Sequence, residues 1–346
     1  MADASHHPRG TESKQDDSPL PVRQSTPTYP LNSGHESASG RQMVKEYVRK
    51  QIEGQVLGIS MPARAPLKLD FLNPPGDRGL FGPGAACWEV HGDFSSMLIG
   101  GMSALLLQML DPLALAGVLD YSNFRADMLG RLRRTAQFIA GTTFGSTYDA
   151  ERLIERVKAI HLEVKGETKD GRAYSATDPE LLTWVHVAEV HSFLQSHLRY
   201  KNPHLSPARQ DQYFDEYALI AERLGAAHVP RSRSAIERYL DERRGLLRCD
   251  ARTLEVFDIV MDAPSPGTSS RWFTWLVKRA AVDLLPPWAL ELFGREPLRP
   301  AVSAALHTTT RLSVKPIRWA VRNSASALAH RRVQADPVRS PSPTHQ

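Results

Sequence analysis

Histidines set among apolar residues are the side chains of this sequence with the clearest potential for chemistry. His161 lies on or beside a helical stripe whose apolar members are Leu153, Val157, Ile160 and Val164. His186 and His191 lie in a second helical pattern, where the apolar neighbours are Leu182, Trp184, Val185 and Phe193. A neutral imidazole is a good ligand for haem iron and other metals. Two such helices predict a haem or metal pocket.

A basic cluster nearer the N-terminus could supply charge to the same pocket. Arg131 and Thr135 lie four residues apart in the run RLRRT, with Arg134 beside them. This spacing makes Arg131 and Thr135 neighbours on one face of a helix. Such a cluster is usually solvated, and that interpretation stays open. The alternative is that one arginine turns inward to meet carboxylates, as the propionates of haem require.

Three interpretations of the histidines compete. The simplest makes His161 a core residue whose ring is bonded to a backbone carbonyl. On pattern alone, His186 is as good a candidate for a metal ligand as His161. A non-haem metal hydrolase built from His161, His186 and Glu189 ranks lower, because the sequence has no His-Glu-x-x-His helix.

The elements that must position these residues are two helices, expected at about 147–164 and 178–198, with the polar connector GETKDGRAYS between them. The connector contains Asp170-Gly171, which is a turn signal. Asp178 is an N-cap candidate, Pro179 suits the first helical position, and Glu180 places an acid in the first turn. The sequence therefore predicts two helices joined by a short turn.

Helical periodicity recurs along most of the chain, and no persuasive strand series or internal repeat appears. Residues 58–92 form a Pro/Gly-rich connector. Further helices are expected at 41–57, 93–111, 112–119, 123–139, 206–224, 232–247, 251–261, 272–285 and 298–321. The fold class is therefore predicted to be all-α.

The longest apolar run, MLIGGMSALLLQM, extends from Met97 to Met109 and is closed by Asp111-Pro112. It is too short to span a bilayer, which takes about 20 apolar residues. We interpret it as a buried core helix, with a helix dipping into a membrane surface as the alternative. Gly100-Gly101 inside it indicates close approach of a flat group or of another helix.

Composition bounds the class of protein. The 346 residues carry a net charge of +5, and 41% of them are hydrophobic, which is enough for a sizeable core. No Lys/Arg-rich block is interleaved with aromatic residues, so we expect no nucleic acid partner. The two cysteines, Cys87 and Cys249, are far apart and favour a reducing, cytoplasmic compartment. The N-terminus lacks the apolar core of a secretory signal.

The two ends of the chain have the composition of disordered segments, since they are rich in Ser, Pro, Arg and Gly and poor in aliphatic residues. We therefore expect disordered tails at 1–42 and 323–346. Between them, residues 43–322 are expected to form a single helical domain.

Several motifs together resemble the oxygenase family that includes latex-clearing rubber oxygenase and the MpaB oxygenase of mycophenolic acid biosynthesis. They are RLRRT at 131–135, RVKAIHLEVKG at 156–166, YSATDPELLTWVH at 174–186, YFDEYALIAERLG at 213–225 and LLPPWALELFG at 284–294. The resemblance covers roughly residues 45–320. It rests on the order and spacing of the motifs, because each motif alone is only modestly specific.

The resemblance implies a globin-like helical bundle around a haem b pocket, with His161 as the ligand of the iron. It places Lys158 where the family motif has an Arg, beside the cofactor. Arg131, Thr135 and Arg134 correspond to distal catalytic residues. The implied function is a haem-dependent oxygenase that uses dioxygen and acts on a hydrophobic, lipid-like or isoprenoid-like substrate.

Two departures from the rubber oxygenase pattern argue against polyisoprene as the substrate. Arg134 replaces a lysine, and Trp184-Val185-His186 resembles the MpaB branch. The alternative function is a cofactor-free helical scaffold or a membrane-peripheral binding module. An absorption spectrum distinguishes these classes, because only a haem protein shows a Soret band.

Overall fold

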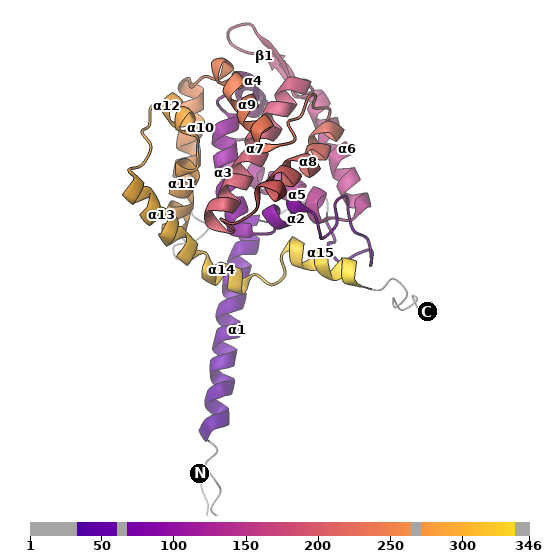
Figure 1. The fold of residues 1–346 in the computed structure, drawn as a ribbon, viewed down its shortest axis with the longest axis vertical. Coiled ribbons are helices and arrows are strands. Elements are labelled where there is room, and N and C mark those ends of the chain that lie inside the picture. The colour runs from indigo at the N-terminus through magenta and orange to yellow at the C-terminus, as the bar shows by residue number, and fades with distance from the viewer. Residues whose placement is uncertain (1–32, 61–67, 264–270, 336–346) are drawn as a thin grey trace, which may run out of the picture. The chain divides into compact units, whose positions relative to one another are not determined.

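The structure, a computed structural model, describes residues 33–60, 68–263 and 271–335. Helices dominate these residues, so the prediction of an all-α fold is confirmed (Figure 1). The helices are α1 (Ser33–Ser60), α2 (Ala86–His91), α3 (Phe94–Gln108), α4 (Pro112–Tyr121), α5 (Met128–Phe144), α6 (Thr147–Glu163), α7 (Pro179–Tyr200), α8 (Pro207–Leu224), α9 (Arg233–Arg243), α10 (Ala251–Asp262), α11 (Arg271–Asp283), α12 (Pro287–Leu292), α13 (Pro300–Ser313), α14 (Lys315–Ala320) and α15 (Ala325–Gln334), with a 3-10 turn at Arg244–Leu246.

The chain divides into two units, Met1–Lys45 and Glu46–Gln346, and the boundary falls within α1. In the second unit α1 is fixed by a buried guanidinium. Arg49 donates to Glu53 Oε2 at 2.8 Å and to the carbonyl oxygen of Ala320 at 3.1 Å. Glu53 in turn accepts from the backbone amides of Arg322 and Asn323. The helix thereby holds the segment that joins α14 to α15.

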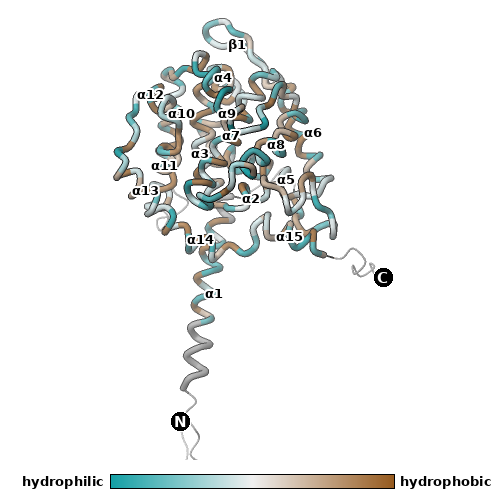
Figure 2. The backbone as a smooth tube through the Cα atoms, viewed as in Figure 1, coloured by the Kyte–Doolittle hydropathy of each residue, from teal (hydrophilic) through white to brown (hydrophobic). Residues whose placement is uncertain are grey.

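The core is organised around α3, which packs along α7 in the middle of the second unit (Figure 1). The backbone coloured by hydropathy shows hydrophobic residues concentrated along α3 (Figure 2). Asp93 caps α3 by accepting from the amide of Ser96, and Arg318 of α14 pairs with the same carboxylate at 2.6 Å. At the other end Trp184 Nε1 donates to the carbonyl of Gln108, and Gln108 donates to that of Val185. The apolar run is therefore the buried core helix that we predicted.

The approach of another helix explains Gly100. A Cβ at Gly100 would lie 3.0 Å from both the carbonyl oxygen of Ser192 and Cδ1 of Phe193, so α7 occupies the space that a side chain would need. At Gly101 the nearest atom, Cε1 of Phe193, would be 3.6 Å away, which is an ordinary contact.

The two glycines therefore make a matched pair of substitutions. We expect Gly100→Ala to lower the free energy of unfolding by about 1–2 kcal/mol, because overpacking outweighs the gain in helix propensity. Gly101→Ala should leave stability unchanged or raise it by up to about 1 kcal/mol. Urea denaturation of both variants is the measurement. Equal destabilisation by the two changes would contradict the packing argument.

The connector between α6 and α7 contains a short antiparallel pair of strands, β1 (Lys165–Glu167) and β2 (Ala173–Ser175), with Gly166 opposite Tyr174. Gly171 has φ +80°, which confirms the turn at Asp170-Gly171. Asp178 caps α7 by accepting from the amides of Glu180 and Leu181, as predicted. The polar turn therefore holds two strands that were not expected.

The prediction of a disordered tail from residue 323 is wrong for residues 325–334, which form α15. Arg332 is fully buried, and its guanidinium donates to the carbonyl oxygens of Asp77, Phe71 and Gly145. Ser324 caps the helix by accepting from the amide of Ala327. Composition alone gives the wrong prediction here. It treats every arginine as a solvated charge typical of a disordered tail, whereas Arg332 is buried. Similarly, α1 begins ten residues before the predicted domain boundary at 43, and residues 1–32 lie outside the described part of the chain.

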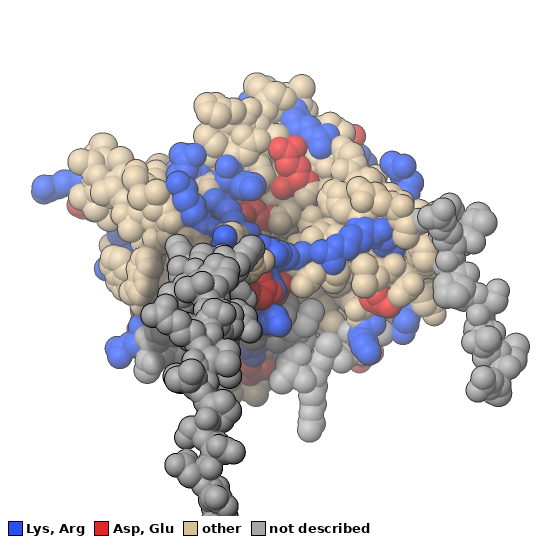
Figure 3. Space-filling model, turned by 90° about the horizontal axis from the view of Figure 1, so that it is seen from below, with Lys and Arg blue, Asp and Glu red and all other residues tan. Residues whose placement is uncertain are grey.

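No single described helix is long and apolar enough to cross a membrane. Helices α3 and α4 together reach that length and apolar composition, but they are bent by 108° relative to each other. Most of α3 is buried inside the protein. The face seen from below in Figure 3 carries many Lys and Arg side chains. Peripheral contact with a membrane stays a prediction.

Candidate functional site

A cavity of about 500 Å³ lies between α3 and α5, is bordered by other elements around it and is partly open to solvent. Its lining also includes residues of α2, α7, α15, the segment 68–71 and the α14–α15 connection. This volume is in the range of sites that hold cofactors and drug-sized ligands. The cavity is therefore the candidate site.

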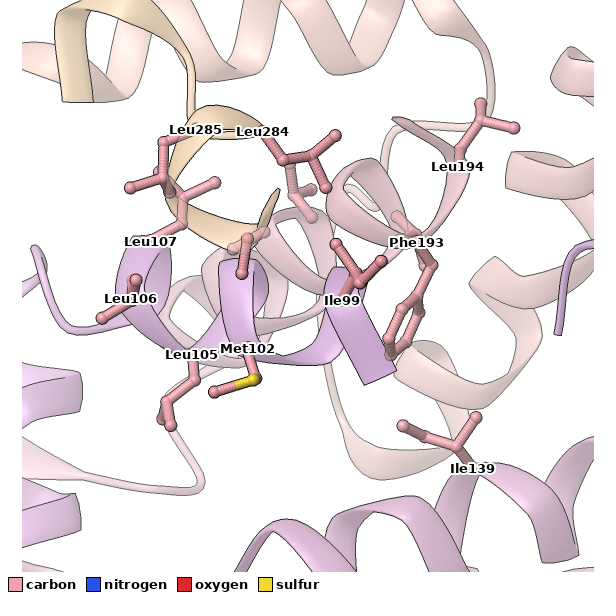
Figure 4. Close-up of a cluster of buried hydrophobic side chains, with 14 of the residues drawn as sticks. Ile99, Met102, Leu105, Leu106, Leu107, Ile139, Phe193, Leu194, Leu284 and Leu285 are labelled. Carbon is pink, nitrogen blue, oxygen red and sulfur yellow. The ribbon is translucent and has the colours of Figure 1, made fainter. Parts of the chain in front are cut away.

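The walls of the cavity are mostly apolar. Figure 4 shows Met102 and Leu105 of α3 and Phe193 of α7 on the side of α3 that faces Ile139 of α5, and all four residues line the cavity. The same view shows Leu284 and Leu285 on the opposite side of α3, in the closed core. One side of α3 thus completes the core and the other forms a wall of the cavity.

Two of the three predicted distal residues line the cavity. Arg131 and Thr135 both come from α5, one helical turn apart. The guanidinium of Arg131 is half-buried and makes no hydrogen bond or ion pair with any residue in the described ranges. Burial and the nearby charge of Arg134 lower the pKa of Arg131 to about 10. An unpaired cation at an apolar wall is suited to bind an anion or a polar oxygen.

Arg134 points away from this site. It is exposed and pairs with the carboxylate of Asp127 at 3.4 Å, and it is absent from the cavity lining. The neighbouring Arg133 does line the cavity, which the sequence analysis did not anticipate. The other residues of the RLRRT run therefore line the cavity, whereas Arg134 is a solvated surface residue.

His161 lies near the end of α6 and is absent from the cavity lining. Its Nδ1 is buried without a hydrogen-bond partner. Burial lowers the pKa of His161, and the positive charge of Arg131 lowers it further. The imidazole and the guanidinium are thus within electrostatic reach of each other. The apolar stripe is shifted from the predicted one, because Ala150, Leu153 and Ile154 are buried whereas Ile160 is 50% exposed.

Lys158 lies one turn before His161 and pairs with Glu155, at 3.0 Å, on the surface of α6. The Nζ atom of Lys158 therefore has a partner of its own, and it does not line the cavity. Nothing in its surroundings distinguishes it from an ordinary solvated lysine.

His186 is buried on α7 beside the ring of Tyr217. Its ring stacks on that of Tyr217, with centroids 6.2 Å apart, and its Nε2 has no hydrogen-bond partner. Burial lowers the pKa of His186 to about 4, so the ring is neutral near pH 7. His186 is 7% exposed and, like His161, is absent from the cavity lining, whereas the His161 side chain is only partly buried.

The sequence analysis missed His91, which lines the cavity from α2. His91 Nδ1 lies 2.9 Å from the hydroxyl of Thr143, and Nε2 lies 2.9 Å from that of Tyr213. Burial lowers the pKa of His91 to about 3, so this imidazole is neutral and both of its nitrogens are satisfied. The residues before His91 are mostly apolar and could have indicated a buried helix. They lie, however, in the Pro/Gly-rich segment 58–92 that we interpreted as an irregular connector.

Glu189 of α7 also lines the cavity, and burial raises the pKa of its carboxyl to about 7. It makes no hydrogen bond or ion pair with the residues that the structure describes. The sequence analysis named Glu189 only as a ligand in the metal hydrolase hypothesis. Among the described residues no three His, Cys, Asp or Glu side chains come together as a metal site, so that hypothesis has no support.

Comparison with known proteins identifies the family to which this chain belongs. The family described as "ER-bound oxygenase mpaB/B'/Rubber oxygenase, catalytic domain" matches residues 88–319, about two thirds of the chain. The chain belongs to this family, as the sequence motifs predicted. Neither a curated protein nor a solved structure gives a significant match.

Proposed function

We propose that this protein is a haem b-dependent oxygenase that uses dioxygen to oxidise a hydrophobic small molecule, with His161 as the ligand of the haem iron. The observation that carries the proposal is the buried, unpartnered Nδ1 of His161 within electrostatic reach of the unpaired Arg131. A buried imidazole nitrogen without a partner is costly, and binding of the ring to a metal offsets that cost.

The residues present fit the chemistry of haem. The porphyrin supplies four nitrogen ligands of its own, so a single protein histidine is enough and no cluster of three ligands is needed. Arg131 has no partner among the described residues, so its guanidinium would be free to contact a propionate or a polar oxygen, while the bond from His161 is what would retain the haem. Lys158 has its own partner on the surface, so we give it no role in holding the group.

Haem, when bound, supplies the redox-active iron that oxygenase chemistry needs. The chain itself does the binding, orienting and shielding. Arg131 and Thr135 present hydrogen-bond donors from one face of α5, where they would orient a polar oxygen in the cavity. The apolar walls from Met102, Phe193 and Ile139 hold a hydrophobic substrate and exclude water around it.

The test of this proposal is the absorption spectrum of the purified protein. We expect a Soret band, and one haem per chain by the pyridine haemochrome assay. Arg131→Ala and Thr135→Ala proteins should keep the band and lose dioxygen consumption, whereas Arg134→Ala should keep both. A protein without porphyrin, even when expressed with added haem, would favour the alternative of a cofactor-free scaffold or membrane-peripheral module.

A further inference from the structure

The carboxyl of Glu189 makes no hydrogen bond or ion pair with the described residues, so it contributes no interaction that stabilises the fold. Glu189 lies on the part of α7 that packs against α3, between the buried Ala188 and Val190, and its carboxyl faces the cavity rather than a partner. Glu189 is half-buried, and partial removal of a carboxyl from water without a partner costs free energy, so an apolar side chain here would serve the fold better.

The other polar groups of the cavity do not compensate Glu189. His91 is neutral, and both of its nitrogens are engaged by hydroxyls. Arg131 lines the same cavity but makes no ion pair with Glu189. Phe193, one turn further along α7, is apolar and closes the wall beside it. Tyr213 and Tyr217 lie within electrostatic reach of Glu189, but the carboxyl makes no hydrogen bond or ion pair with the described residues and is therefore available to a molecule inside the cavity.

We infer that Glu189 binds a hydroxyl group of the ligand, so that the cavity selects an amphipathic alcohol, such as a long-chain or terpenoid alcohol, over a pure hydrocarbon. A hydroxyl donates to the ionised carboxylate and accepts from the protonated carboxyl, so it satisfies Glu189 in both states. A ketone satisfies only the protonated state, and an ammonium only the ionised one. This inference rests on the proposed function, because it takes the cavity as the substrate site.

A pair of ligands that differ in one donor tests the inference. Decanol and decyl methyl ether share the alkyl chain, but only decanol can donate a hydrogen bond. The comparison is made at pH 9, where Glu189, with its pKa of about 7, is ionised and can only accept. Their affinities are measured on the purified full-length protein by displacement of the fluorescent apolar probe N-phenyl-naphthylamine. We expect wild type to bind decanol about tenfold or more tightly than the ether, because one hydrogen bond to a charged or buried partner is worth about that factor.

Two variants attribute the preference to Glu189. Glu189→Leu should bind the two ligands equally, with the affinity for the ether unchanged or improved. Glu189→Gln, which keeps an acceptor of the same shape, should retain part of the preference. Ser326→Ala, which removes another hydroxyl from the cavity lining, should bind as wild type does. Thermal unfolding by circular dichroism checks that each variant folds, and we expect Glu189→Leu to be no less stable than wild type.

Equal affinity of wild type for the two ligands, or a preference that survives in Glu189→Leu, would overturn the inference. The haem content of the same preparations separates this outcome from failure of the proposed function. A haem-free protein that still prefers decanol refutes the oxygenase proposal and keeps the role of Glu189. A haem-loaded protein that binds both ligands equally refutes the role of Glu189 and keeps the proposal of a haem protein.

Discussion

His161→Ala protein is expected to lose haem completely, while His186→Ala protein keeps it. His161 is the only one of the two that combines a buried, unpartnered nitrogen with a partly exposed side chain and the nearby charge of Arg131. His186 has an unpartnered nitrogen too, but its ring is held against Tyr217 in closely packed surroundings. A haem held by one histidine would lose its only bond to the protein when that ligand is removed, so retention should fall below detection.

The measurement is haem per protein after gel filtration, for both variants prepared in parallel. Imidazole added to His161→Ala should restore part of the Soret absorption, because it can occupy the space left by the side chain. Lys158→Ala is the matched control on the same face of α6, and we expect it to bind haem normally. A fully haem-loaded His161→Ala protein would end the assignment, and loss of haem from His186→Ala alone would transfer it to His186.

The second large effect concerns stability. Arg332→Leu is expected to lower the free energy of unfolding by about 3 kcal/mol, because it leaves three buried carbonyl oxygens without their donor. Those carbonyls belong to Phe71, Asp77 and Gly145, so the substitution also weakens the attachment of α15 to the rest of the fold. The neighbouring Arg331 is exposed, and Arg331→Leu should change stability by about 0.5 kcal/mol or less.

Thermal unfolding of the two arginine variants provides the comparison. For a chain of this size, about 3 kcal/mol corresponds to a decrease in Tm of roughly 4–5 °C. Limited proteolysis should cut Arg332→Leu protein near α15 before wild type is cut. Identical Tm values for Arg331→Leu and Arg332→Leu would show that the buried guanidinium contributes nothing to stability.

Local sequence signals were enough to predict most helices of the described chain. Asp178-Pro179 and Ser206-Pro207 mark the starts of α7 and α8, because N-caps and prolines act through a few neighbouring atoms. The glycine turn at Gly171 was predictable for the same reason. Helix α2 was missed, since six residues inside a Pro/Gly-rich segment leave too little periodicity to recognise.

The candidate site was only partly predictable, because a pocket depends on which side of each helix meets which neighbour. Spacing placed Arg131 and Thr135 on one face, and the cavity lies on that face. The same spacing could not tell that Arg134 faces solvent. His91 and Glu189 join the site only through the packing of α2 and α7 around α3, which no local pattern contains.

The cavity wall extends beyond the part of the chain that the family shares. Residues 88–319 carry α3, α5 and α7, whereas Val56, Phe71, Val321 and Leu328 complete the lining from outside that region. Arg49 and Glu53 fasten the two outer segments to each other. Under the proposed function, changes in these outer segments would alter which substrates the cavity admits without changing the residues proposed for chemistry. For an engineer, these outer segments are the place to widen or narrow what the protein admits, without touching the residues proposed for chemistry.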